Sequence, residues 1–111
     1  MSLDLYLESP ECVTCGHSEE YFHSNYTYNV SKMWYEIYPD AEGMVDIDKM
    51  TGTEAYKTLC HARTILEENP SKFIKMNPEN GWGNYHGFLD FINALIKACL
   101  EHPTGVWNSW R

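Results

Sequence analysis

The stretch Ser2-Leu3-Asp4-Leu5-Tyr6-Leu7-Glu8 carries the pattern on which the expected fold depends. Its three leucines alternate with polar or amphipathic residues, so the leucines share one face and the other side chains share the opposite face. An alternation with a period of two is typical of a β-strand that is buried on one side. Pro10 has no backbone N–H to donate and ends this strand. A second, short strand is predicted over residues 20–24, where aromatic residues are frequent.

Helical spacing dominates the rest of the chain. Apolar residues recur at steps of three and four over residues 27–38, 53–68 and 88–102. This spacing places them on one face of an α-helix. The tail, residues 105–111, is expected to return as a final strand. Together these elements predict one α+β domain that spans the chain, with three main helices packed on a small, mostly antiparallel sheet.

Short polar residues mark the expected helix starts. Asn25 or Thr27 is expected to cap the first helix, because a short polar side chain accepts hydrogen bonds from the free N–H groups of a first turn. Thr51 and Glu54 have the spacing of a capping box at the start of the second helix. A short helical turn is predicted over residues 71–76.

The composition is that of a folded domain with an acidic surface. The chain has 111 residues, of which 43% are hydrophobic and 14% aromatic, and this is enough for one core. Sixteen acidic residues against eight basic ones give a formal charge of −8 at pH 7. Such a charge repels phosphate backbones and anionic lipid headgroups. It therefore disfavours nucleic-acid binding and favours a basic partner, or serves only to keep the protein in solution.

The first residues and the hydropathy profile favour a cytoplasmic protein. Residues 1–8 lack the cationic and long apolar regions of a signal peptide, and no later stretch approaches the roughly 20 apolar residues of a membrane span. We therefore expect no membrane association. In a reducing cytoplasm, the four cysteines are expected to be thiols or metal ligands rather than structural disulfides.

A Cys-x-x-Cys-Gly knuckle is the sharpest chemical feature of the sequence. Cys12 and Cys15 have the spacing of half a zinc site, and Gly16 permits the tight backbone bend that such a site needs. His17 and His23 are the nearest further ligands. Free thiols and a redox-active or disulfide-bonded pair are the alternatives to bound zinc.

The redox alternative has little support from the surrounding residues. A thioredoxin-like pair is followed by a helix that lowers the thiol pKa, whereas Gly16-His17-Ser18 is typical of a loop. Cys60 and Cys99 lie in helical patterns and are expected to be small buried hydrophobic residues.

Two polar-aromatic segments, residues 25–29 and 77–85, form a second candidate site. Asn amides, Tyr hydroxyls and a Trp ring in loops beside helix starts can bind a small molecule or a peptide. The candidate residues are Asn25, Thr27, Asn29, Asn80, Trp82 and Tyr85. The same residue types also cap helices, shape turns and fill the rim of a core, which is the structural alternative.

The leading functional hypothesis is a non-enzymatic accessory protein that binds a protein or a small ligand. The binding region is expected to be the acidic surface or the Asn/Trp/Tyr loops. A small zinc protein with its metal at Cys12 and Cys15 is the rival, and an enzyme acting at the loops is third. The sequence contains no nucleophile elbow, no His-Glu-x-x-His pair and no phosphate-binding P-loop.

Three blocks of sequence resemble a group of small uncharacterised proteins from bacteria and their phages. The resemblance rests on residues 2–7, on Asn25-x-Thr27-x-Asn29-Val30-x-Lys32-Met33, and on Asn77-Pro78-Glu79-Asn80-Gly81-Trp82-Gly83-x-Tyr85-x-Gly87-Phe88. It implies a bacterial or phage setting and transfers no mechanism. In that group the position of Tyr28 is commonly His and some members lack the two-cysteine knuckle, which implies that metal binding is not general.

Overall fold

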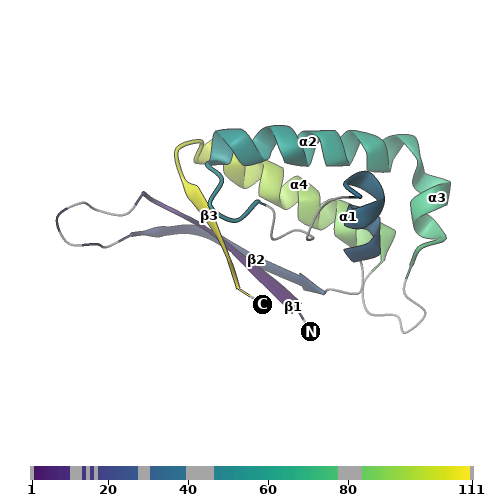
Figure 1. Cartoon of the computed structure of the whole chain (residues 1–111), viewed down its shortest axis with the longest axis horizontal. Coiled ribbons are helices and arrows are strands. Elements are labelled where there is room, and N and C mark those ends of the chain that lie inside the picture. Colours follow the sequence, from purple (N-terminus) through teal and green to yellow (C-terminus); the bar gives the residue numbers. More distant parts are fainter. Residues whose placement is uncertain are drawn as a thin grey trace.

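The protein is an α+β domain with a three-stranded sheet covered on one face by helices. The computed structural model describes residues 2–10, 14, 16, 18–27, 31–39, 47–77 and 84–110. Its elements are β1 (Ser2–Glu8), β2 (Glu20–Thr27), α1 (Ser31–Ile37), α2 (Gly52–Glu68), α3 (Pro70–Ile74), α4 (Tyr85–Glu101) and β3 (Val106–Trp110). The strand order is β2-β1-β3, and α2 and α4 run side by side above one face of the sheet (Figure 1). The predicted fold class is confirmed.

Strand β1 lies in the middle of the sheet and pairs antiparallel with both neighbours. Leu5 and Leu7 are fully buried on the face that meets the helices. Asp4, Tyr6 and Glu8 alternate with them on the opposite side, which we call the outer face. The alternation in the sequence therefore predicted both the strand and the face that it buries.

The predicted second strand exists and is longer than expected. It continues to Thr27, which lies opposite Ser2, while Asn25 lies opposite Asp4. The register shifts between Leu7 and Glu8, so one extra residue of β2 forms a bulge near the start of that strand.

The expected start and caps of the first helix are wrong. Helix α1 begins at Ser31 rather than near Thr27, and both proposed caps, Asn25 and Thr27, are strand residues. The pairing of this stretch with β1, over a long sequence distance, places both residues in a strand, and it prevails over the local preference for a helix start. The helical periodicity itself was correct, because Met33 and Trp34 are fully buried.

Helix α2 has the capping box and the buried face that its sequence predicted. The backbone N–H of Glu54 donates to Thr51 Oγ1 at 3.2 Å, and the Thr51 N–H donates to Glu54 Oε1 at 3.1 Å. The hydrogen bond from the Thr51 N–H lowers the pKa of the Glu54 carboxyl, because it favours the charged form of that group. The four apolar residues predicted to share one face are all fully buried: Ala55, Leu59, Ala62 and Leu66.

Helix α4 and strand β3 complete the core. The helix ends at Glu101, next to the predicted end, and begins at Tyr85, where the Asn84 side chain accepts a hydrogen bond from the Gly87 N–H at 2.8 Å. The tail forms β3, as expected, and Trp107 on this strand is fully buried beneath the helices. Among the described residues, no helix is both long and apolar enough to cross a bilayer.

Candidate functional site

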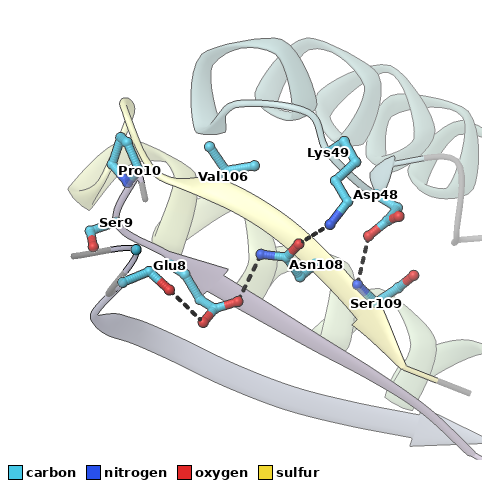
Figure 2. A pocket seen from close by; sticks show the side chains of 10 residues that line it. Glu8, Ser9, Pro10, Asp48, Lys49, Val106, Asn108 and Ser109 are labelled. Atoms are coloured by element: carbon cyan, nitrogen blue, oxygen red, sulfur yellow. Dashed lines mark hydrogen bonds between the residues drawn. The ribbon is translucent and has the colours of Figure 1, made fainter. Parts of the chain in front are cut away.

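A polar pocket of about 460 Å³ lies beside the end of β1 and along β3 (Figure 2). Its walls come from four parts of the chain: the end of β1, the connection between β1 and β2, the residues before α2, and β3. The polar lining residues that matter below are Glu8, Ser9, Ser18, Asp48, Lys49 and Asn108.

Asn108 links an acidic and a basic side chain across this pocket. Its Nδ2 donates to Glu8 Oε1 at 2.7 Å, and its Oδ1 accepts a hydrogen bond from Lys49 Nζ (Figure 2). The other oxygen of Glu8 accepts a hydrogen bond from Ser18 Oγ at 3.3 Å. Because an ammonium only donates and a carboxylate only accepts, these two neighbours fix which way the Asn108 amide points. The pocket therefore has a defined pattern of donors and acceptors.

The residues before α2 are hydrogen-bonded to the side of β3 that faces away from β1. The backbone N–H of Lys49 donates to the Trp107 carbonyl at 2.7 Å, and the Trp107 N–H donates to the Met50 carbonyl at 2.9 Å. Asp48 Oδ1 accepts from the Ser109 N–H at 2.8 Å. We call residues 48–51 the edge segment. Trp107 anchors β3 in the core, because its side chain is fully buried, and these bonds to β3 place Asp48 and Lys49 at the pocket.

Lys49 has a backbone conformation that side chains other than glycine rarely adopt. Its φ is 70°, in the left-handed region. A residue held there stores conformational strain, and such strain is concentrated at functional sites. The backbone hydrogen bond to β3 offsets this strain, and in this conformation the Lys49 ammonium donates to Asn108.

The charges of the pocket favour a cationic ligand group. Glu8 and Asp48 contribute two carboxylates against the single ammonium of Lys49. Each carboxylate has acceptor sites beyond the bonds described above, because an ionised carboxylate offers about four lone-pair positions. Ammonium and guanidinium groups are the natural partners for such acceptors.

The connection between β1 and β2 borders the pocket and contains the cysteine knuckle. Ser9 closes this loop, since its N–H donates to the Glu19 carbonyl and its Oγ accepts from the Glu19 N–H, both at 2.7 Å. Gly16 has a φ of 72°, so the tight bend expected after the second cysteine is present. Cys12, Cys15 and His17 lie outside the described residues, and the zinc site stays a prediction.

His23, the fourth suggested zinc ligand, stands on the outer face of the sheet. Its ring stacks on Tyr6 with centroids 4.4 Å apart, and its Nε2 lies 3.2 Å from Asp4 Oδ1. Asp4 is farther along β1 from the knuckle than Tyr6 is, so this nitrogen points away from the loop. No group of three or more metal-binding side chains occurs within the parts of the chain that the structure describes.

The six residues of the Asn/Trp/Tyr patch have different environments. Asn25 is exposed on β2 and Thr27 ends that strand. Tyr85 is only 3% exposed, its hydroxyl donates to the Leu66 carbonyl at 2.7 Å, and burial raises its pKa. Tyr85 therefore has the structural role that the sequence left open as an alternative. The remaining members, Asn29, Asn80 and Trp82, lie outside the described residues, so the patch stays a prediction.

Cys99 has the expected character of a small buried residue. It is 1% exposed, and its Sγ accepts a hydrogen bond from Trp107 Nε1 at 3.4 Å. Burial raises the pKa of this thiol to about 11, so it remains protonated at neutral pH. Cys60 is half-buried on α2.

Sequence reasoning did not identify the pocket residues Glu8, Asp48, Lys49 and Asn108. No local spacing connects them, because the Glu8–Asn108 hydrogen bond joins residues that are 100 positions apart. Models of known protein families, curated protein sequences and solved structures were compared with the chain, and none matches it.

Proposed function

We propose that the chain is a non-enzymatic accessory protein that binds a partner protein by taking a Lys or Arg side chain into the pocket. The observation that carries this proposal is the arrangement of Glu8 and Asp48 around Asn108 and Lys49, which supplies oriented acceptors and an excess of negative charge. The formal charge of −8 supports it, since the field of the whole chain attracts a basic partner.

The setting that we propose is the cytoplasm of a bacterial or phage-infected cell. The resemblance in residues 2–7, 25–33 and 77–88 supports this setting. An acidic accessory protein there meets many basic surfaces, so selection has to come from pocket geometry as well as from charge.

The test is a titration of the isotope-labelled protein with three capped tripeptides, Gly-Arg-Gly, Gly-Lys-Gly and Gly-Gln-Gly. We expect the Arg or Lys peptide to shift the nuclear magnetic resonance signals of the Asn108 side-chain amide and the Ser109 backbone amide. The Gln peptide is neutral and of similar length, so we expect it to leave both signals in place.

Two matched variants distinguish binding in the pocket from attraction to the overall negative charge. Glu8→Gln with Asp48→Asn keeps the shape of both side chains and removes two charges, and we expect it to weaken peptide binding about tenfold. Glu67→Gln with Glu68→Gln removes the same charge from an exposed stretch of α2, and binding should stay within about twofold. Equal losses in both variants would refute a specific pocket.

A zinc-binding role is a second candidate, supported by one observation. Gly16, directly after Cys15, has the left-handed conformation that a two-cysteine knuckle requires. We expect about one zinc equivalent in protein purified without chelator, and its loss with a lower melting temperature in Cys12→Ser. Less than a tenth of an equivalent, with an unchanged melting temperature, would exclude this role.

A further inference from the structure

The two edge strands of the sheet, β3 and β2, differ in whether other residues cover their free side. The outer edge of β3 is covered, because the edge segment exchanges hydrogen bonds with Trp107 and accepts the N–H of Ser109. The outer edge of β2 has no comparable cover within the described part of the chain. An uncovered edge strand presents unpaired N–H and C=O groups to which another strand can pair.

The register identifies the free groups of β2. The N–H and C=O of Trp107 point to the edge segment, so its partner across the ladder, Leu7, directs its own groups towards β2. Leu7 pairs with Phe22, whose groups therefore point to β1. Backbone N–H and C=O groups point to alternate sides from one residue to the next along a strand. The groups of His23 and Asn25 therefore point away from β1, towards the uncovered edge of the sheet.

The sequence of β2 lacks the usual protection of an edge. Lys and Pro are common on edge strands that avoid pairing, and β2, with the sequence EYFHSNYT, contains neither. Its bulge lies near the start of the strand, so residues 22–27 pair regularly. This stretch is long enough to receive a short added strand.

The charges near this edge favour a basic segment as the occupant. Apart from Glu8, which is bonded to Asn108 at the pocket, strands β1 and β2 contain the carboxylates Asp4 and Glu20 and neither Lys nor Arg. Asp4 lies on the outer face of the sheet, opposite Asn25 in the register. An added strand beside β2 would lie about 10 Å from β1, which is two strand spacings. A Lys or Arg side chain on the same face of that strand can extend towards Asp4, which brings its charge within the Debye length of about 8 Å at physiological salt. A second copy of the chain would bring the same acidic strands and a further charge of −8.

We propose that the outer edge of β2 binds an extended, Lys- or Arg-containing segment of a partner protein as a fourth strand of the sheet. Backbone hydrogen bonds to His23 and Asn25 supply the pairing, and the carboxylates of Asp4 and Glu20 select for positive charge. This inference goes beyond the proposed function, because none of the pocket residues Glu8, Asp48, Lys49 and Asn108 pairs with the added strand.

The test uses two capped nine-residue peptides, one alternating Lys with Val and one alternating Glu with Val. We expect the Lys peptide to bind and to slow hydrogen exchange at the His23 and Asn25 amides at least tenfold, while the Glu peptide does not bind. Asn25→Pro removes an outward N–H without removing a bond to β1, and it leaves the charge unchanged. We expect it to weaken binding of the Lys peptide at least tenfold.

Two further measurements keep the test decisive even where the proline variant fails to fold. The Lys peptide is N-methylated at its odd positions in one sample and at its even positions in another, and only one of these should bind the unchanged protein. The affinity of Glu8→Gln with Asp48→Asn for the unmodified Lys peptide should stay within about threefold of that of the unchanged protein. This result would distinguish binding at the β2 edge from binding in the pocket.

Three results would overturn the inference. The first is equal binding of both N-methylated peptides, which would mean that no strand pairing occurs. The second is equal binding by Asn25→Pro in its folded state. The third is a peptide-free dimer with protected His23 and Asn25 amides, which would make a second copy the occupant.

Discussion

The indole N–H of Trp107 donates a hydrogen bond to the Sγ of Cys99 at 3.4 Å, and this contact joins β3 to α4 inside the core. The Trp107 ring is fully buried and meets the edge of Phe22 on β2, with centroids 6.1 Å apart. Because its own backbone also holds the edge segment, Trp107 connects the sheet, a helix and the pocket wall. The stability of the fold and the position of Lys49 therefore depend on the same residue.

Trp107→Ala should lower the free energy of unfolding by about 3–5 kcal/mol, because it removes a buried aromatic ring and leaves a cavity. Trp107→Phe keeps part of the packing and should cost less. Urea denaturation at neutral pH measures both. Tyr35→Ala, at an aromatic residue that is 42% exposed, serves as the control and should change stability by less than about 0.5 kcal/mol. A similar loss in both Ala variants would contradict this account of the core.

Raising the pH from about 9 to 11 should destabilise the protein through Cys99. Burial raises the pKa of its thiol from 9.0 to about 11, so in this range the unfolded chain has released the proton while the folded chain still holds it. The unfolded state is then favoured by further increases in pH, and the effect is absent below pH 9. The measurement is the free energy of unfolding as a function of pH.

Cys99→Ala is the comparison for the pH experiment. We expect its stability to fall less steeply between about pH 9 and pH 10 than that of the unchanged protein. Burial also raises the pKa of Tyr38 and Tyr85, and those groups contribute at higher pH in both proteins. Identical slopes below pH 10 would show that the thiol does not contribute.

Thr51→Ala should lower the free energy of unfolding by about 1 kcal/mol. It removes the oxygen that accepts the Glu54 N–H at the start of α2 and leaves that donor without its cap. Thr64→Ala is the matched control, because Thr64 lies on the exposed side of the same helix and its hydroxyl donates to the Cys60 carbonyl of the preceding turn. Thermal denaturation should show little change or a slight gain for Thr64→Ala.

Lys49→Gly should stabilise the fold by about 0.5–1 kcal/mol, because glycine adopts a positive φ without strain. The same variant removes the ammonium that orients Asn108, so the selectivity of the pocket for Arg or Lys over Gln should fall. Lys57→Gly, in the exposed face of α2, should instead destabilise by about 1 kcal/mol. A loss of stability in both variants would mean that the backbone at Lys49 is not strained.

Local patterns were sufficient where local forces decide the structure. The leucine alternation predicted β1, the Thr51/Glu54 pair predicted the start of α2, and the periodicity before His102 predicted α4 and its end. Each of these depends on residues within a few positions of one another. The first helix was misplaced at its start because residues 25–27 pair with a strand about twenty residues away.

The candidate site shows the same division. From the formal charge of −8 the sequence predicts either a basic partner or a surface that serves only solubility, and from residue types it predicts a zinc site at the Cys12 to Gly16 knuckle and a binding surface at the Asn/Trp/Tyr loops. It did not identify the pocket, because Glu8, Asp48 and Asn108 meet only after β1, β3 and the edge segment have been placed side by side.

The sequence by itself determined the class of fold, the buried faces of β1 and of the three main helices, and the sign of the net charge, because these follow from the order and kind of neighbouring residues. Tertiary structure alone decided the strand order, the cover over the edge at β3, the edge of β2 that the described residues leave uncovered, and the orientation of the Asn108 amide. The physical reason is that hydrogen bonds across a sheet join residues by register, and register depends on how the whole core packs.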